Sequence, residues 1–159
     1  MSEIKIKKQE GHDFLYIKGD LWMTTNPWEK RLQKYIAEQA HGDVLIAGYG
    51  LGVVQKFLQE SRLVSSVTSV EINPEIMALC EERYRKIHGR VILGDFYKFP
   101  ENIKYDCVIG DIAQEMDSQF LEDYKMFKEK AEKLIKPEGK ILAWGQDFFE
   151  YLIEKEKGK

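Results

Sequence analysis

From His41 onward, short strand-like runs alternate with amphipathic helical segments, and this alternation constrains the fold more than any other feature. The expected strands lie at residues 44–47, 67–70, 91–93, 107–109 and 140–144. Strands that alternate with helices build βαβ units, whose right-handed crossovers give a parallel sheet covered on both faces. The sequence therefore predicts an α/β fold in which the first and fourth of these strands are adjacent. A ligand crevice is expected at their carboxyl ends.

A separate segment precedes this region. Residues 1–25 are predicted to form a β-hairpin and lid extension, with its turn at residues 11–13 between two apolar stretches. Residues 26–159 are expected to form one domain, because the whole chain of 159 residues is within the usual size of a single domain.

Two helices have recognisable boundaries. Asn26-Pro27 predicts a helix start, because Asn caps and Pro occupies the first helical position. A long amphipathic helix is expected between residues 117 and 135, ended by Pro137-Glu138-Gly139. The residues expected on one face of the first helix, by their helical spacing, are Trp28, Leu32, Tyr35 and Ile36.

Composition excludes several classes of protein. The chain is 43% hydrophobic and 32% charged with a net charge of −3, which is typical of a globular domain and unfavourable for general binding of polyanions. Cys80 and Cys107 have neither disulfide-framework nor zinc-ligand spacing, so neither a disulfide nor a metal site is expected. The first residues lack the apolar stretch of a signal peptide and no apolar run reaches membrane-span length, so we expect a cytoplasmic protein.

A glycine-rich turn follows the first strand of the alternating region. Gly48, Gly50 and Gly52 allow a tight turn and close approach of a ligand to the backbone. Glu71 ends the next strand, where an acidic side chain can accept hydrogen bonds from both ribose hydroxyls. Val53 replaces the third glycine of the NAD fingerprint, and no P-loop Lys-Ser/Thr follows. These residues favour an adenosine ligand without phosphates, such as S-adenosylmethionine.

Five segments occur in order along the chain: Asp43 to Gly52, Val70-Glu71-Ile72-Asn73-Pro74-Glu75, Leu93-Gly94-Asp95, Tyr105 to Asp111 and Leu134 to Lys140. Together they resemble the motifs of class I S-adenosylmethionine-dependent methyltransferases. The resemblance covers roughly residues 13–145, and within the superfamily the spermidine synthase-like branch is most similar. The resemblance to this branch is carried by Phe14-Leu15-Tyr16-Ile17-Lys18-Gly19-Asp20 before the core and by the segment from Val70 to Glu75.

This resemblance implies a Rossmann-like fold and a role for each matching residue. The glycines, with Tyr49 among them, would lie under the methionine part and the ribose of the cofactor. Glu71 would bind the ribose hydroxyls and Ile72 would pack against the adenine. Asp95 would accept the exocyclic amine of the adenine, with Phe96 as a stacking neighbour.

Asp111, at the end of the fourth strand, is the candidate catalytic residue. A nucleophilic amine must be neutral, so a carboxylate that orients it or takes its proton assists transfer. Gln114 and Glu115 are candidate substrate contacts. The segment of Trp22 resembles the lid region of spermidine synthase-like and guanidinoacetate methyltransferase-like enzymes, which implies that Trp22 lines the crevice. Capping by Asp111 and a solvated loop at residues 114–115 are the alternatives.

The expected function is methyl transfer to a small molecule, at nitrogen. Asp111-Ile112-Ala113-Gln114 lacks the Pro-Pro-aromatic motif of enzymes that methylate base amines, so nucleic acid is not the expected partner. Aminopropyl transfer from decarboxylated S-adenosylmethionine is one alternative, although Gln114 and Glu115 replace the second Asp and the Pro of spermidine synthases. A non-catalytic cofactor-binding or regulatory subunit is the other alternative.

The C-terminal end of the fold is expected to be truncated. Class I methyltransferases usually continue past the fifth strand with a helix and two antiparallel strands, whereas Asp147 to Glu156 suffices for one helix. The fifth strand would then have an unpaired edge. We expect the N-terminal hairpin or a second subunit to cover that edge, and hence a homo-oligomer.

Overall fold

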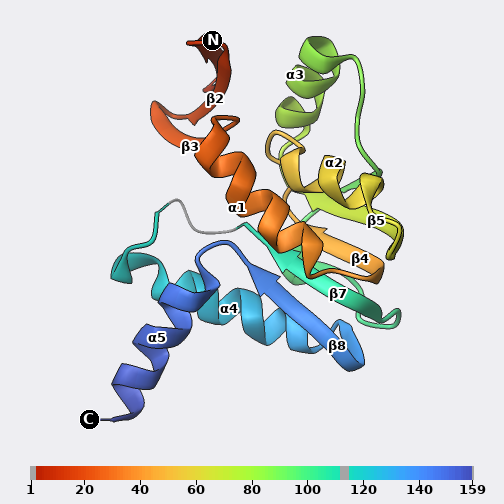
Figure 1. The fold of residues 1–159 in the computed structure, drawn as a ribbon, viewed down its shortest axis with the longest axis vertical. Coiled ribbons are helices and arrows are strands. Elements are labelled where there is room, and N and C mark those ends of the chain that lie inside the picture. The colour runs from red at the N-terminus through yellow and green to blue at the C-terminus, as the bar shows by residue number, and fades with distance from the viewer. Residues whose placement is uncertain (1–2, 112–114, 159) are drawn as a thin grey trace.

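The computed structural model describes residues 3–111 and 115–158, which form two β-sheets and the helices around them (Figure 1). The N-terminal elements are β1 (Ile4–Gln9), β2 (His12–Ile17), β3 (Asp20–Thr24) and α1 (Pro27–Glu38). The central elements are β4 (Gly42–Ala47), α2 (Val53–Glu60), β5 (Val64–Glu71), α3 (Pro74–Tyr84), β6 (Arg90–Leu93), η1 (Phe96–Lys98) and β7 (Tyr105–Gly110). The last elements are η2 (Ser118–Phe120), α4 (Leu121–Glu132), β8 (Ile135–Ala143) and α5 (Gln146–Lys157).

The larger sheet in the described part of the chain has five parallel strands in the order β6-β5-β4-β7-β8. β4 pairs with β7, so the predicted adjacency of the first and fourth strands of the alternating region is confirmed. The order reverses at β4, and an open α/β sheet leaves a crevice at such a point, outside the carboxyl ends of the strands. The α/β prediction is therefore confirmed.

Helices cover both faces of this sheet (Figure 1). On one face, α1 and α2 pack against β4 and β7 through a cluster that includes Ile36, Leu58 and the wholly buried Val44. On the other, α4 and α5 contribute Tyr124, Phe127 and Phe149, none of which is exposed to solvent. These two apolar layers fix the sheet, and with it the strand ends that border the crevice.

The buried face of α1 matches the predicted one only in part: Ile36 is buried as expected, at 7% exposed, and Leu32 is half-buried. Asn26 caps the helix as expected, accepting a hydrogen bond from the Glu29 N–H at 2.8 Å. Trp28 and Tyr35, however, are 67% and 60% exposed, whereas Gln33 is 1% exposed. The helix is rotated relative to the apolar stripe because Gln33 has polar partners inside the molecule, which offset the cost of burying its amide.

The N-terminal segment forms an antiparallel sheet of its own, in the order β1-β2-β3. The predicted hairpin is present as β1 and β2, and β3 adds a strand that the pattern did not indicate. The sheet is attached to α3, where Arg83 and Tyr84 both donate hydrogen bonds to the Asp13 carboxylate; the Tyr84 hydroxyl lies 2.5 Å from Oδ2. Apolar contacts across the same junction include Leu15 and Ile76. The division of the chain at residue 25 stays a prediction.

The segment around Pro137 was predicted incorrectly. The helix there ends at Glu132, and Pro137-Glu138-Gly139 lies within β8 instead of ending the helix. The pairing with β7 passes from Tyr105↔Ile135 directly to Cys107↔Lys140, so the intervening residues bulge out of the ladder. A bulge accommodates a proline, which has no N–H to donate.

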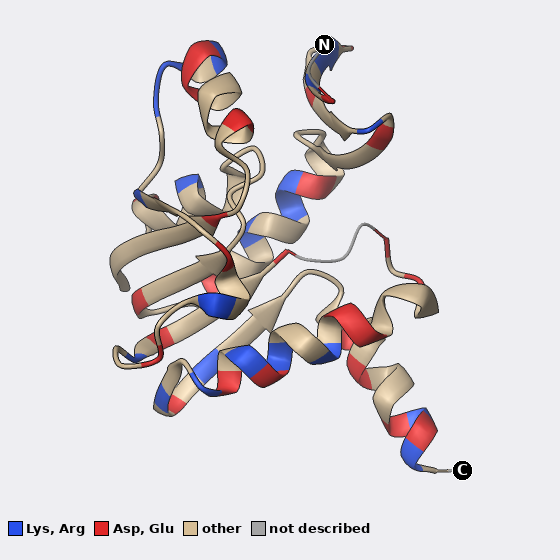
Figure 2. Ribbon diagram, turned by 180° about the vertical axis from the view of Figure 1, so that it is seen from behind, with Lys and Arg blue, Asp and Glu red and all other residues tan. Residues whose placement is uncertain are grey.

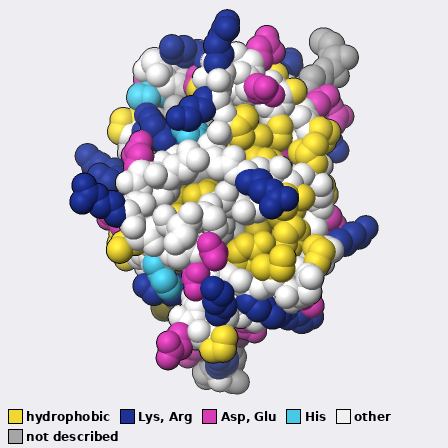
Figure 3. Space-filling view, turned by 90° about the vertical axis from the view of Figure 1, so that its right-hand side faces the viewer, with side chains coloured by type: hydrophobic (Ala, Val, Ile, Leu, Met, Phe, Trp, Pro, Cys, Tyr) yellow, Lys and Arg dark blue, Asp and Glu magenta, His cyan; other side chains and the backbone are white. Residues whose placement is uncertain are grey.

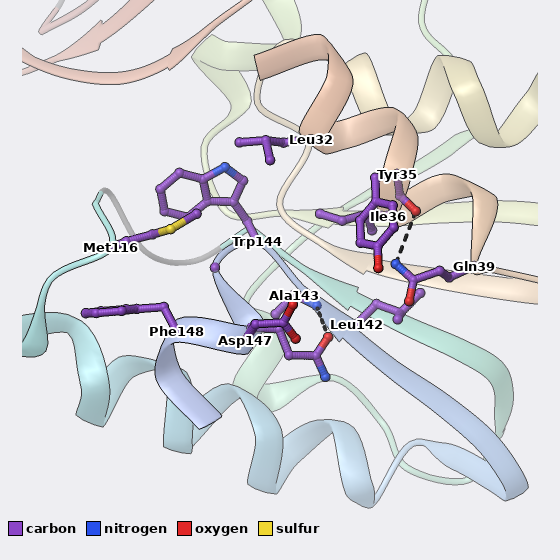
Figure 4. A pocket seen from close by; sticks show the side chains of 12 residues that line it. Leu32, Tyr35, Ile36, Gln39, Met116, Leu142, Ala143, Trp144, Asp147 and Phe148 are labelled. Carbon is purple, nitrogen blue, oxygen red and sulfur yellow. Dashed lines mark hydrogen bonds between the residues drawn. The ribbon is translucent and has the colours of Figure 1, made fainter. Parts of the chain in front are cut away.

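The outer edge of β8 is occupied by a side chain of the same molecule. The Trp144 N–H donates to Gly110 on the β7 side, so the edge groups of Ile141 and Ala143 point outward. The Gln146 amide bonds both: its Nε2 donates to the Ile141 carbonyl at 3.0 Å, and its Oε1 accepts from the Ala143 N–H at 3.3 Å (Figure 4, dashed line at Ala143). The expectation that the N-terminal hairpin covers this edge is wrong, because β1–β3 form a separate sheet that does not pair with β8.

Charges of both signs are distributed over the surface. Acidic and basic residues are interspersed along α4 and at the C-terminal end of α5 (Figure 2), and on the face in Figure 3 both kinds surround an apolar area. Within residues 3–111 and 115–158, no helix combines the length and apolarity needed to cross a membrane.

Replacing Gln146 tests its bonds to the sheet edge. We expect Gln146→Ala to accelerate amide exchange at Ala143 and to lower the free energy of unfolding by about 1–2 kcal/mol, since two hydrogen bonds are lost. Hydrogen exchange followed by NMR, with a denaturant titration, measures both. Gln39→Ala is the control, because the Gln39 amide donates to the Tyr35 carbonyl at the C-terminal end of α1. Unchanged exchange at Ala143 would show that the edge is not protected by Gln146.

Asp13 makes the attachment of the N-terminal sheet dependent on pH. Burial raises the pKa of Asp13, but the hydrogen bonds from Arg83 and Tyr84 outweigh it and hold the pKa below its ordinary value of 3.8. A carboxyl with a lowered folded-state pKa stabilises the fold above pH 3.8, and this contribution is lost as the pH falls through the folded value. We expect Asp13→Asn to cost about 1–2 kcal/mol at pH 7.

Urea titrations between pH 7 and pH 3 measure this difference. The loss caused by Asp13→Asn should diminish below pH 3.8, while Asp20→Asn, an equal charge change at an exposed position of the same sheet, should have little effect throughout. A loss that does not vary with pH would contradict an ionic attachment.

Candidate active site

A cavity of about 600 Å³ lies at the carboxyl ends of the central strands and is bordered by the N-terminal sheet. Side chains of β2 and β3, including Leu15 and Met23, form one wall. The segment at residues 48–52, here called the glycine loop, and the ends of β5, β6 and β7 form the remainder. The predicted site residues that line it are Trp22, Gly48, Tyr49, Gly50, Glu71, Ile72, Asp95, Phe96 and Asp111. The predicted crevice is therefore present, and it brings together most of the residues that the sequence singled out.

Glu71 connects the glycine loop to the end of β5. Its side chain is 4% exposed, and each carboxylate oxygen accepts a backbone hydrogen bond: Oε1 from the Tyr49 N–H at 2.9 Å and Oε2 from the Asn73 N–H at 3.0 Å. Each oxygen retains acceptor capacity for a ligand hydroxyl. Glu71 thus holds the loop in place and borders the cavity at the same time.

The glycines of the loop have different surroundings. Gly48 and Gly50 line the cavity, and a Cβ on Gly48 would meet nothing within 4 Å. Gly52 is not among the lining residues; a Cβ there would lie 2.4 Å from the hydroxyl oxygen of Tyr49. The Tyr49 ring is 3% exposed, and its hydroxyl accepts from the His88 N–H at 2.9 Å. Gly52 therefore makes room for a buried ring instead of approaching a ligand.

Asp95 and Phe96 lie at the far end of the cavity, just after β6. The Asp95 carboxylate borders the cavity and caps η1, accepting from the Tyr97 N–H at 2.9 Å. Phe96 is only 6% exposed and stacks on Phe127 of α4, with ring centroids 5.7 Å apart. Ile72, by contrast, is 69% exposed. Phe96 therefore supports this end of the cavity from the core, while Ile72 presents an exposed apolar side chain.

Asp111 follows β7 and faces the cavity near the glycine loop. The Gln33 amide donates to its Oδ2 at 3.2 Å. Burial, together with the nearby carboxylate of Glu29, raises the pKa of Asp111 to about 7. A carboxyl group in this range changes charge near neutral pH, which suits a group that exchanges a proton with a ligand.

The substrate residues predicted beyond Asp111 are not part of this arrangement. Glu115 is exposed and absent from the lining of the cavity. Gln114 lies outside the described residues. Trp22, 41% exposed, does border the cavity from β3.

Two lining residues that the sequence interpretation did not select are Gln55 and Met23. Gln55 is 1% exposed; its Nε2 donates to Gly48 O and Ser69 Oγ, while its Oε1 is buried without a partner among the described residues. The Met23 sulfur accepts from the Leu51 N–H at 3.2 Å. In the sequence, only the position of a polar residue on the inner face of α2 indicated that Gln55 could have a role in the site. Nothing in the sequence indicates the contact of the Met23 sulfur.

A second, smaller cavity of about 160 Å³ lies between α1, β8 and the start of α5. In Figure 4 the Trp144 ring lies between Met116 and Leu32, and most of the lining is apolar. Neither the glycine loop nor Asp111 borders this cavity, so the two cavities are separate sites.

The fold is that of the class I S-adenosylmethionine-dependent methyltransferases. The structure of CcbJ methyltransferase from Streptomyces caelestis aligns with a TM-score of 0.56 at 20% identity, over 74% of this chain and 49% of that one. CalS10, an amino pentose methyltransferase from Micromonospora echinaspora solved with S-adenosylmethionine bound, aligns with a TM-score of 0.53 at 18% identity, over 76% and 52%.

A curated relative is similar in sequence. The ribosomal RNA small subunit methyltransferase A of Porphyromonas gingivalis is 29% identical over 124 residues, which are 75% of this chain and 44% of the relative. The chain thus spans less than half the length of this relative. No protein-family model matches the chain.

The packing of Gly52 against Tyr49 can be tested by adding one methyl group. We expect Gly52→Ala to lower the free energy of unfolding by more than about 2 kcal/mol, because a left-handed backbone position costs about 1–2 kcal/mol and the Cβ also meets the Tyr49 ring. Thermal and urea denaturation measure the loss. Gly11→Ala is the matched control, since Gly11 has a similar φ of +81° but open space around it. Equal losses in the two variants would exclude a steric role for the ring.

Proposed function

We propose that this chain binds S-adenosylmethionine in the larger cavity and transfers its methyl group to the nitrogen of a small amine. The observation that carries the proposal is the position of Asp111 in the same cavity as the glycine loop, Glu71 and Asp95. The class I methyltransferase fold supports it.

The residues of the cavity fit this cofactor chemically. Gln55 Oε1 is a buried acceptor without a partner among the described residues, suited to an N–H donor. Gly48 leaves open space where a side chain would stand. Glu71 and Asp95 offer carboxylate oxygens for the ribose hydroxyls and the adenine amine, and Ile72 offers an apolar contact. These groups match a cationic adenosine ligand without phosphates.

When bound, S-adenosylmethionine supplies a methyl group on a sulfonium leaving group; the bond from carbon to sulfur breaks as the bond from nitrogen to carbon forms. The residues of the chain position the nucleophile and exclude water. With a pKa of about 7, the Asp111 carboxylate is suited to orient an amine and accept its proton. Trp22 and Met23 close the cavity on the side of the N-terminal sheet.

CalS10, a structural neighbour, is an amino pentose methyltransferase, which favours an amine substrate. A second candidate is a nitrogen of RNA, favoured by the ribosomal RNA methyltransferase relative. Against it stand the net charge of −3 and the mixture of both charges on the face shown in Figure 3.

Aminopropyl transfer and a non-catalytic cofactor-binding role are the alternative functions, and the experiments below separate them. We further propose a cytoplasmic protein that assembles as a homo-oligomer.

Cofactor binding is tested by calorimetry and thermal denaturation with S-adenosylmethionine, its decarboxylated form and S-adenosylhomocysteine. At a concentration of 100 Kd, a ligand stabilises the fold by about 2.7 kcal/mol. We expect Asp95→Asn to weaken binding of S-adenosylmethionine about tenfold, through loss of a charged acceptor. Asp117→Asn is the control: Asp117 also caps a short helix, accepting from the Gln119 N–H at 3.0 Å, but does not line the cavity. If neither S-adenosylmethionine nor S-adenosylhomocysteine binds, the proposal fails.

The reaction is tested with S-adenosylmethionine carrying a radioactive methyl group. We expect label in a pool of small amines and none in small-subunit ribosomal RNA; label in the RNA alone would establish the second candidate. Preferential binding of decarboxylated S-adenosylmethionine would favour aminopropyl transfer. Cofactor binding without transfer to either pool would favour a non-catalytic subunit.

A further inference from the structure

One side chain of α1, Gln33, contacts Asp111 directly, and a second, Glu29, is joined to Asp111 through Gln33. Gln33 is 1% exposed, and its Nε2 donates both to Asp111 Oδ2 at 3.2 Å and to Glu29 Oε1 at 3.0 Å. One amide nitrogen thus joins two carboxyl groups from distant parts of the chain. Neither Glu29 nor Gln33 lines the cavity, whereas Asp111 does.

We propose that Glu29 and Gln33 are positioning residues for Asp111: they fix the direction of its carboxyl group toward the cavity and determine how readily it takes up a proton. This inference rests on the proposed function, because it assigns these residues to the same site. Gln33 restrains Asp111, and Glu29 supplies a negative charge behind it.

The geometry explains why this helix face is buried. A buried glutamine amide needs hydrogen-bond partners, and the Gln33 Nε2 donates to one carboxyl group on each of two residues, Glu29 and Asp111. The Asn26 cap fixes the start of α1 one turn earlier, by accepting from the N–H of Glu29 itself. The cap thus fixes the backbone of Glu29 in the first turn of the helix, and the hydrogen bond from Gln33 holds its carboxyl group.

Two carboxyl groups that share one amide donor do not ionise independently. Like charges disfavour each other's ionised form, so the pair loses its protons in two separated steps. The pKa of Glu29 is raised by burial, while the hydrogen bond from Gln33 lowers it. The indole N–H of Trp144 faces Glu29 from the end of β8 and also favours its ionised form, although its geometry is not that of a standard hydrogen bond.

The two positioning residues act on Asp111 in opposite directions. The charge of Glu29 raises the pKa of Asp111, and the hydrogen bond from Gln33 lowers it. Removing the charge of Glu29 should therefore lower the pKa of Asp111, and removing the donor of Gln33 should raise it. A general loss of stability in both variants would not shift the pKa of Asp111 in opposite directions.

The test follows the carboxyl ¹³C resonances of Asp and Glu side chains as a function of pH in the cofactor-free protein, with the Asp111 signal assigned by Asp111→Asn. We expect Glu29→Gln, which keeps an amide oxygen to accept from Gln33, to lower the Asp111 midpoint by about one pH unit or more. We expect Gln33→Met to raise it. Glu38→Gln, an equal charge change at an exposed position of α1, should leave it unchanged.

An unchanged midpoint in Glu29→Gln, or an equal shift in Glu38→Gln, would overturn the inference. If Gln33→Met does not fold, the comparison of Glu29→Gln with Glu38→Gln still tests whether Glu29 affects the titration of Asp111. Because the titration needs neither cofactor nor substrate, its result is independent of whether S-adenosylmethionine binds. Failure of the proposed function would instead appear in the calorimetric titration as absence of binding to the wild-type chain.

Discussion

Both oxygens of the Glu71 carboxylate accept backbone hydrogen bonds, and the geometry of the larger cavity depends on this one buried group. The Tyr49 N–H belongs to the glycine loop and the Asn73 N–H to the turn before α3. Glu71 therefore joins the ends of two adjacent strands to the two helices that follow them. Without it, the loop would have a buried N–H to satisfy elsewhere, and the wall of the cavity would lose its shape.

Much of the fold was predictable because strand and helix periodicities are strong between residues 41 and 111. The Asn caps of α1 and α3 were predictable from local sequence alone, since capping involves neighbouring residues. The position of Pro137 within β8 could not be predicted in this way, because it depends on a bulge opposite β7. Local rules interpret Pro-Glu-Gly as a helix stop and contain no information on the partner strand.

The candidate site was predictable at the strand ends but not beyond them. Gly48, Glu71, Asp95 and Asp111 follow strands directly, so topology brings them together whatever the details of packing. The contact of Gln33 with Asp111 joins residues 78 positions apart and depends on the rotation of α1 about its axis. The apolar stripe suggested the wrong rotation, because Trp28 and Tyr35 lie on the surface while a glutamine is buried.

The Gln146 side chain at the edge of β8 also limits how the larger sheet can grow. A strand arriving at this edge would have to replace the two hydrogen bonds that the amide already makes with Ile141 and Ala143. The Ala143 N–H and the Ile141 carbonyl would each exchange one hydrogen bond to Gln146 for one to the new strand. Pairing at these two groups therefore adds no hydrogen bond. Lasting association at this edge would therefore depend on apolar contact with its surroundings, where Trp144 and Met116 border the smaller cavity. Backbone pairing alone would not sustain it.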